Sequence, residues 1–245
     1  MMKNNPDDYA KYLEWDSTFF NKRIARVNGN FLTSERVECI NQWSKDRNID
    51  CLYFLATIND DQTVICAEKD GYHFVDLRIT LEVQSDMASD SLVRKDNIRF
   101  AQISDIQSLC HIAGTNHTNS RFFTDSHFDR GKCQKLYGVW IEKSVRSRHD
   151  RVFVWEVQDQ AVAYVTTAIN NDRKSGQIEL VGIAPEWQKK GIGRELVAEA
   201  LSYFTKNRVQ TITTVTQGRN IHALKLYQKC GFSIRSIEIW YHKWF

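Results

Sequence analysis

In the first third of this chain, hydrophobic residues recur with two different periods, one typical of strands and one typical of helices. Short segments rich in β-branched and aromatic residues follow the period of two that a half-buried strand shows, whereas the longer segments between them follow the helical period. The predicted strands span residues 24–27, 51–56 and 72–83, and the predicted helices span residues 34–46 and 61–69. Strands and helices therefore alternate, which predicts a layered α/β unit.

A polar stretch, Gln84–Ser91, follows the third of these strands. It is rich in serine and aspartate and offers little to bury, which is typical of a linker. The pattern then resumes and predicts a strand at 98–101, a helix at 105–113, a loop at 120–123, a helix at 132–144, strands at 152–157, 161–168 and 177–183, and further elements to the C-terminus. We therefore predict a smaller, partial α/β domain over residues 1–90 and a larger α/β domain over residues 91–245.

The composition narrows the classes of protein to consider. With 245 residues, 42% hydrophobic and 26% charged, the chain is typical of a soluble globular protein, and its net charge of +3 is too small to indicate a nucleic-acid partner. Its six cysteines form no Cys-x-x-Cys pair and have no zinc-like histidine spacing, so we expect reduced thiols and no metal. No apolar stretch approaches the ~18 residues of a membrane span, and residues 1–8 lack the apolar core of a signal peptide. We expect a cytoplasmic protein without a membrane partner.

The most informative segment is Val181–Leu196, where an apolar run stops at Pro185 and passes through a basic, glycine-containing turn into an amphipathic helix. Backbone N–H groups of such a turn and the positive end of the helix dipole attract anions, and Gly191 and Gly193 let a phosphate approach the backbone closely. Additional side-chain donors are Gln188, Lys189, Lys190 and Arg194. A nucleotide-triphosphate loop would need Lys-Ser/Thr after the second glycine, and a dinucleotide loop would need a third glycine where Leu196 stands. Taken alone, the segment could equally be an ordinary strand-to-helix turn with surface lysines.

A second motif follows about twenty-five residues later, after the β-branched strand Thr213–Thr216. The segment Asn220–Phe232 predicts a helix that begins at Asn220 as its N-cap and ends at a glycine. Tyr227 lies two turns into this helix, on the face of Asn220. A helical tyrosine is more often a core aromatic with its hydroxyl at the rim, but the pairing of the two motifs favours a functional role.

The motifs Gln-x-x-Gly-x-Gly and Asn-x-x-Ala-x-x-x-Tyr-x-x-x-Gly-Phe, in this order and at this distance, resemble those of the GNAT superfamily of N-acyltransferases. The resemblance implies an α/β fold with a central mixed sheet flanked by helices, with four strands before the phosphate loop and two after it in residues 98–245. It also implies that the co-substrate is an acyl-CoA, either acetyl-CoA or a short acyl-CoA such as 3-hydroxybutyryl-CoA. The residues expected to bind it are Ile183, Gln188, Lys189, Lys190, Gly191, Ile192, Gly193, Arg194 and Asn220.

The chemistry of such an enzyme is attack of a neutral primary amine on a thioester. Backbone N–H groups near Gly182–Ala184 are expected to hold the thioester oxygen if the strand splays there, and Tyr227 is expected to protonate the leaving sulfur. Glu179, on the strand that leads to the loop, is the first candidate for the base, although it could equally be a solvated strand residue. Its rivals are Asp16, His117 and His127, and the amine could also lose its proton to solvent.

Three stretches resemble the bacterial dTDP-fucosamine N-acetyltransferases: Leu13–Phe20, Ser120–Phe123 with Tyr137-x-x-Trp140-Ile141-Glu142, and the C-terminal stretch from Tyr227 through Ile239-Trp240-Tyr241. This resemblance implies a dTDP-linked amino-dideoxyhexose, with its amine at carbon 3 or 4, as the acceptor, used for surface polysaccharide such as the O-antigen of lipopolysaccharide. An aspartate beside aromatic rings suits an amino sugar, and an arginine can pair with a diphosphate. The residues expected to bind the acceptor are Trp15, Asp16, Phe19, Phe20, Arg121 and Trp240. Each aromatic residue among them could instead belong to the core.

Two other functions stay open. The chain could acetylate a different amine, such as a peptide, an antibiotic or an amino acid, although these acceptors would not need the N-terminal segment. It could also be a noncatalytic CoA-binding sensor, but a sensor could dispense with Tyr227. The oligomeric state is open as well, with a homodimer as one option.

Overall fold

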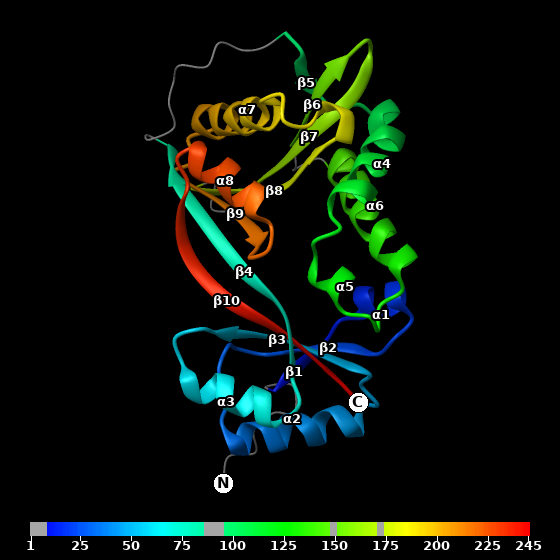
Figure 1. The fold of residues 1–245 in the computed structure, drawn as a ribbon, viewed down its shortest axis with the longest axis vertical. Coiled ribbons are helices and arrows are strands. Elements are labelled where there is room, and N and C mark those ends of the chain that lie inside the picture. The colour runs from blue at the N-terminus through cyan, green and yellow to red at the C-terminus, as the bar shows by residue number, and fades with distance from the viewer. Residues whose placement is uncertain (1–8, 86–95, 148–150, 171–173) are drawn as a thin grey trace.

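One twisted sheet runs through the whole protein (Figure 1). The computed structural model describes residues 9–85, 96–147, 151–170 and 174–245. Its strands lie in the order β1-β2-β3-β10-β4-β9-β8-β7-β6-β5. Their bounds are β1 Ala10–Tyr12, β2 Ile24–Val27, β3 Cys51–Thr57, β4 His73–Gln84, β5 Ile98–Phe100, β6 Arg151–Val157, β7 Gln160–Ile169, β8 Ser175–Ile183, β9 Thr211–Gln217 and β10 Ser233–Trp244. Because β2/β3 and β8/β9 are parallel pairs and the other pairs are antiparallel, the predicted mixed sheet is confirmed.

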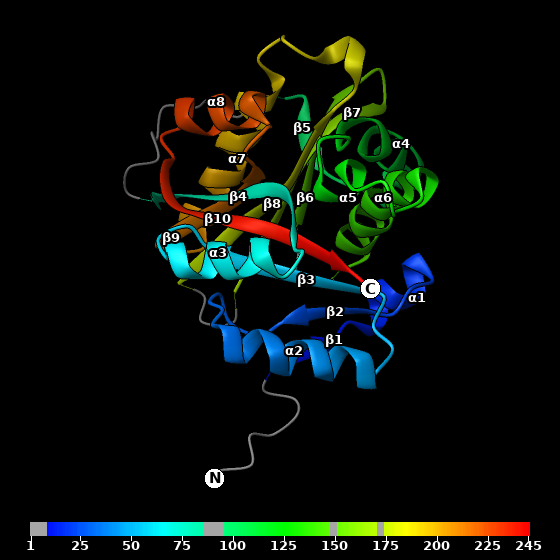
Figure 2. The same ribbon diagram turned by 60° about the horizontal axis from the view of Figure 1, so that its bottom comes forward.

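Helices cover both faces of the sheet. Figure 1 shows α4, α5 and α6 together on one side, with α7 and α8 on the other, and Figure 2 shows α3 beside β3 and α2 beside β1 and β2. The first face is closed by a core that joins α1, α4, α5 and α6 to Tyr53 and Tyr164, and the second face is closed by two cores, one under α7 and α8 and one under α2 and α3. The bounds are α1 Glu14–Phe20, α2 Ser34–Asp46, α3 Asp61–Lys69, α4 Ile106–Asn116, α5 Arg121–Thr124, α6 Arg130–Arg146, α7 Ile192–Lys206 and α8 Ile221–Lys229.

The sheet joins the two parts that we predicted as separate domains. Strand β4 comes from the N-terminal part but lies between β10 and β9, and β10 also pairs with β3. The boundary between residues 90 and 91, and most of the polar stretch Gln84–Ser91, lie outside the described residues. The division into two domains therefore stays a prediction. Strands from both parts are hydrogen-bonded to one another in the middle of the sheet.

Most elements match their predictions. Helices α2 and α3 have the predicted bounds, and the four strands β5 to β8 before the phosphate loop and the two strands β9 and β10 after it are confirmed. The prediction of a loop at 120–123 is wrong, because Ser120 O accepts hydrogen bonds from the amides of Phe123 and Thr124 and closes the short helix α5. Strand β1 and helix α1 had no prediction, since three and seven residues are too few for a clear period. In the described part of the chain, no helix has the length and apolar character that a membrane span requires.

Candidate active site

Strands β8 and β9 separate part of the way along their length. Their register pairs run from Ser175/Thr211 to Ile178/Thr214 and then stop, although β8 continues to Ile183 and β9 to Gln217. Beyond this point β8 pairs only with β7 and β9 only with β4. A bulge accompanies the separation, because one residue of β7 (Thr166) faces two of β8 (Glu179 and Leu180) between the pairs Val165/Val181 and Thr167/Ile178. The predicted splay of the strand is therefore present, and the backbone of β8 faces a gap.

Helix α7 begins beside this gap with a backbone suited to an anion. Lys189 and Gly191 have positive φ angles of 61° and 82°, so the amides of the turn face outward. Among the hydrogen bonds of the described residues, none is donated by the backbone N–H groups of residues 189–193. A Cβ on Gly191 would meet nothing within 4 Å, so the approach to this backbone is open. The first turn of a long helix with unpaired amides, flanked by exposed Lys189, Lys190 and Arg194, fits a diphosphate group.

The amides of Gly182–Ala184 do not all face the gap. The Ala184 amide donates to Val162 O at 2.9 Å, on the β7 side. Because amides alternate in direction along a strand, Ile183 is the residue whose N–H faces away from β7. That N–H donates to Oδ1 of Asn116, at the end of α4, at 3.2 Å. Gln188, which we predicted as a ligand of the co-substrate, donates to Ile183 O at 3.1 Å and so braces the loop.

Tyr227 lies at the closed end of the gap. Asn220 caps α8 as predicted, accepting a hydrogen bond from the Ala223 amide at 3.1 Å, and this places Tyr227 in the core, where it is 4% exposed. Burial raises the pKa of Tyr227 to about 12. An interaction with the Thr214 hydroxyl lowers this pKa in part, although that hydroxyl has no partner of full hydrogen-bonding geometry. Thr214 is the last residue of β9 that pairs with β8. A neutral phenol is thus held at the point where the two strands part.

The four candidate bases lie in different places. Glu179 is exposed and lies in the bulge of β8, on the strand that borders the gap. Asp16 lies on α1, where burial raises its pKa against the opposing charge of Arg121. His117 contacts the hydroxyl of Tyr164 at 3.1 Å, and burial lowers its pKa to about 4, which makes it a weak base. His127 is engaged by Asp125 at 2.8 Å. Of the four candidates, Glu179 is therefore favoured as the base by its position on the strand that borders the gap.

The structure brings several of the predicted acceptor residues into contact with one another. The Arg121 guanidinium lies 4.4 Å from the ring centroid of Trp240 and 4.2 Å from that of Tyr53. On α1, the exposed ring of Trp15 stacks on Phe19 at 5.0 Å. Phe20 is buried and stacks on Phe122 in the core, which is the alternative role that the sequence left open for it.

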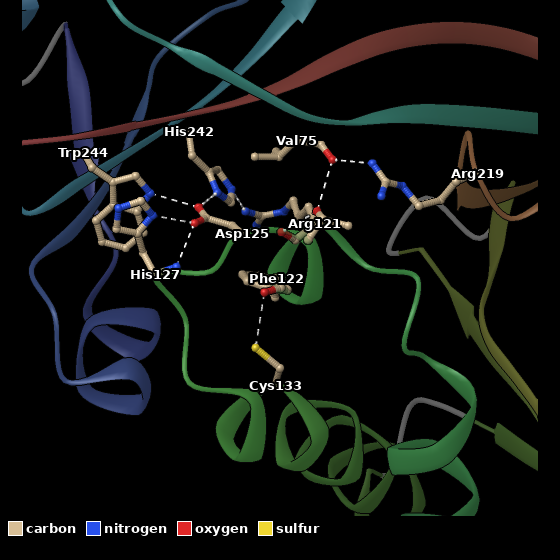
Figure 3. Close-up of polar contacts among 10 residues, drawn as sticks. Val75, Arg121, Phe122, Asp125, His127, Cys133, Arg219, His242 and Trp244 are labelled. Atoms are coloured by element: carbon tan, nitrogen blue, oxygen red, sulfur yellow. Dashed lines mark hydrogen bonds and ion pairs between the residues drawn. The ribbon is translucent and has the colours of Figure 1, made fainter.

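Sequence reasoning missed the residues that hold Arg121 (Figure 3). Arg121 Nη1 lies 2.7 Å from Nε2 of the fully buried His242, and His242 Nδ1 lies 2.6 Å from Oδ2 of Asp125. Because arginine can only donate, Nε2 accepts, and the proton of the neutral ring is on Nδ1, where it is donated to Asp125. Trp244 Nε1 also donates to this oxygen, at 2.9 Å. Burial opposes ionisation of Asp125, but these hydrogen bonds and those from His127 outweigh it and hold its pKa well below the usual range.

The partly buried His117 and the fully buried His242 predict a pH dependence of stability. Burial lowers the pKa of both His117 and His242 to about 4, whereas a histidine of the unfolded chain titrates near 6.5. The unfolded state therefore binds more protons between these values, and the free energy of unfolding should fall as the pH is lowered from 6.5 to 4, by up to ~1.4 kcal/mol per pH unit for each histidine. Urea unfolding between pH 7 and pH 4.5 measures this slope.

His117→Phe should reduce that slope by up to ~1.4 kcal/mol per pH unit, because it removes one titrating group. The phenyl ring can keep the stack on Tyr137, whose ring centroid lies 4.4 Å from that of His117. His127→Ala is the control, since the His127 side chain is 55% exposed. An unchanged slope in His117→Phe would contradict the assignment of a neutral His117 to the native state.

The mixed sheet with its parted strands, the open start of α7 and the buried Tyr227 are the arrangement that the sequence predicted for an N-acyltransferase. The sequence model of the acetyltransferase (GNAT) family matches residues 106–232, just over half of the chain. The chain belongs to this family. Among the described residues, no three histidine, cysteine, aspartate or glutamate side chains are grouped so that they could hold a metal ion.

Curated relatives share short stretches with the chain. The spore coat polysaccharide biosynthesis protein SpsD of Bacillus subtilis is 24% identical over 140 residues, which are 57% of this chain and 48% of that protein. The uncharacterized N-acetyltransferase YvbK of the same organism is 29% identical over 119 residues, 49% of this chain and 64% of that protein. Spermidine N(1)-acetyltransferase of Vibrio cholerae is 28% identical over 138 residues, 55% of this chain and 77% of that protein. The chain thus spans about half to two thirds of the length of the first two relatives.

Solved structures share the fold over nearly the whole chain. A functionally unknown conserved protein from Staphylococcus epidermidis superposes with a TM-score of 0.68 at 15% identity, covering 99% of this chain and 92% of that one. A GCN5-related N-acetyltransferase from Sphaerobacter thermophilus superposes with a TM-score of 0.65 at 13% identity, covering 96% and 76%. The likeness therefore includes the N-terminal strands and helices.

Proposed function

We propose that this chain transfers an acyl group from acyl-CoA to the amino group of a dTDP-linked amino-dideoxyhexose. The observation that carries the acyl-transfer part is the gap between β8 and β9, with unpaired amides at the start of α7 beside it and a neutral Tyr227 at its closed end. The donors we propose are acetyl-CoA and short acyl-CoA molecules such as 3-hydroxybutyryl-CoA.

The proposed binding of acyl-CoA uses the backbone of residues 189–193 for the diphosphate. Lys189, Lys190 and Arg194 add charge to this backbone, and Asn220 lies at the start of the neighbouring helix α8. The Ile183 amide would receive the thioester oxygen once Asn116 gives up its hydrogen bond. A donor placed at a developing oxyanion is typically worth ~3 kcal/mol of barrier.

The proposed chemistry assigns two proton transfers to this chain. Glu179, exposed in the bulge of β8, accepts the proton of the amine directly or through water. Tyr227 donates its hydroxyl proton to the leaving sulfur, and its raised pKa keeps that proton in place until the thiolate forms. Each thioester bond that breaks is then matched by one new amide bond and one thiol.

The proposed acceptor is supported by the contact of Arg121 with Trp240 and by the similarity to SpsD, a spore coat polysaccharide biosynthesis protein. Arg121 suits a diphosphate, Trp240 and Trp15 offer aromatic faces, and Asp16 can bind hydroxyl or ammonium groups. The second candidate is a free amine, because spermidine N(1)-acetyltransferase is among the relatives. A polycation is a poor match for a surface that carries Arg121, however.

Thiol release distinguishes these acceptors. Acetyl-CoA and 3-hydroxybutyryl-CoA are each tested with dTDP-3-amino and dTDP-4-amino-6-deoxyhexoses, and with spermidine, free amino acids and a peptide as controls. Release with one dTDP-sugar alone is the expected result and also gives the position of the amine. Release only with spermidine, amino acid or peptide would refute the sugar acceptor, and binding of acyl-CoA without release in any arm would favour a noncatalytic sensor.

A further inference from the structure

Two arginines lie against the same tryptophan on the face of the sheet that carries Arg121. The guanidinium carbon of Arg121 lies 4.4 Å from the ring centroid of Trp240, and that of Arg26, on β2, lies 5.3 Å from it. The strand register agrees with this placement, since Arg26 pairs with Tyr53, and Tyr53 pairs with His242, two residues beyond Trp240. Two cations from elements far apart in sequence therefore meet at one ring.

Neither cation forms a close ion pair in the described part of the chain, although Asp16 interacts with Arg121 and Glu238 with Arg26 over longer distances. Arg78 is paired with Glu238 at 2.6 Å and Arg219 with Asp76 at 3.5 Å, but no described carboxylate lies within 4.0 Å of Arg26 or Arg121. Desolvation and the neighbouring charges of Arg121 and Arg78 lower the pKa of Arg26. Two close cations without a carboxylate in direct contact repel each other, and a bound anion would reduce this repulsion.

The buried hydroxyl of Tyr53 lies at the same place. Tyr53 is 1% exposed, its ring lies 4.2 Å from the Arg121 guanidinium, and its hydroxyl interacts with Arg121 but has no partner of full hydrogen-bonding geometry. Buried polar groups in native proteins nearly always have a well-aligned partner, so this hydroxyl has the capacity for one more hydrogen bond. His242 occupies only Nη1 of Arg121, which leaves further guanidinium donors for a planar, two-point contact with a phosphate.

The distance from the gap restricts the shape of the acceptor. Strand β10, which carries Trp240, is two positions from β9 in the sheet. Neighbouring strands are about 4.8 Å apart, so Trp240 lies on the order of 10 Å from the strand that borders the gap. An acceptor that reaches both places is extended, with its amine at one end and its anionic group at the other.

We propose that Arg121, Arg26 and the Tyr53 hydroxyl bind the diphosphate of a nucleotide-linked acceptor, and that His242 and Asp125 are positioning residues for Arg121. This inference rests on the proposed function for the identity of the acceptor, but not for the existence of the anion site. His242 contributes by accepting from Nη1, and Asp125 contributes by keeping the ring proton on Nδ1. Together they fix the plane of the guanidinium against Trp240.

Calorimetric titration of dTDP and of inorganic pyrophosphate tests the site directly. Both probes are titrated into protein saturated with CoA, so that the start of α7 is already occupied. Arg26→Ala and Arg121→Ala should each weaken binding of dTDP by about 10-fold or more, because each removes a charged donor from the phosphate. Arg235→Ala is the matched control, since Arg235 lies on the same strand as Trp240 but pairs with Glu82 at 3.4 Å. It should change the affinity less than twofold.

A double-mutant cycle tests the positioning role. His242→Phe can keep the ring contact with Tyr53, whose centroid lies 4.7 Å away, but removes the acceptor for Arg121. It should weaken binding of dTDP without changing the Kd of CoA, and it should have no further effect in an Arg121→Ala background. Equal losses in both backgrounds would assign His242 a purely structural role and overturn this part of the proposal.

The outcomes separate the anion site from the proposed function. Failure of the CoA-saturated protein to bind either probe, or binding that survives both arginine substitutions, overturns the anion site. Acylation of a dTDP-sugar with an unchanged KM in Arg26→Ala and Arg121→Ala would also overturn the site, yet it would support the proposed function. Acylation of a peptide alone, with arginine-dependent binding of pyrophosphate, would refute the sugar acceptor and support the anion site.

Discussion

Tyr227→Phe is expected to lower kcat about 100-fold, the lower range of what a positioned general acid contributes. The structure gives the reason, because Tyr227 is the buried phenol at the point where β8 and β9 part, and its pKa of about 12 keeps it protonated at any physiological pH. The Kd of acyl-CoA should stay within about twofold, since the proposed diphosphate contacts come from residues 189–193. Steady-state kinetics and calorimetric titration of acyl-CoA measure the two quantities separately.

Tyr203→Phe on α7 is the matched control, because it removes the same atom from a tyrosine that packs on Phe153, in the same core cluster. It should leave kcat unchanged. The free energy of unfolding of both variants should lie within about 1 kcal/mol of the wild-type value, since neither variant loses an aromatic ring. Equal turnover in Tyr227→Phe and the wild type would remove Tyr227 as the acid, whereas a large loss of stability in Tyr227→Phe would indicate a structural role for its hydroxyl.

The elements of the phosphate loop and of helix α8 could be predicted because their signals are local. Gly191 has the positive φ that a glycine accommodates, and the side-chain oxygen of Asn220 accepts a hydrogen bond from the Ala223 amide in the first turn of α8. Both signals are readable within a few residues of sequence. The resulting prediction of strand, turn and helix therefore agrees with the structure.

The rest of the candidate site could not be predicted, because it depends on contacts between distant segments. Asn116 reaches the Ile183 amide across 67 residues, and His242 meets Asp125 across 117 residues. Arg26 reaches Trp240 only because β10 inserts between β3 and β4. No local period or cap encodes these pairings, since strand neighbours in a mixed sheet are chosen by tertiary packing.

Gly182→Ala is expected to reduce the free energy of unfolding by about 2 kcal/mol, the cost of forcing a methyl group into a filled core. A Cβ at position 182 would lie 2.5 Å from Cε1 and 2.8 Å from the hydroxyl oxygen of Tyr164. The Tyr164 ring is fully buried and its hydroxyl is held by His117 at 3.1 Å, so the ring cannot move aside easily. Strand β8 must shift instead. Chemical denaturation measures the loss.

The same shift should lower kcat/KM about 10-fold, because displacement of the next residue, Ile183, moves the amide that we propose for the thioester oxygen. Gly138→Ala is the control: its Cβ would meet nothing closer than 3.6 Å, so in helix α6 the change should be neutral or slightly stabilising. Tyr164→Leu combined with Gly182→Ala should cost less than the sum of the two single changes, since the smaller side chain removes the clash. Strict additivity would mean that the backbone of β8, and not the Tyr164 ring, requires a glycine at this position.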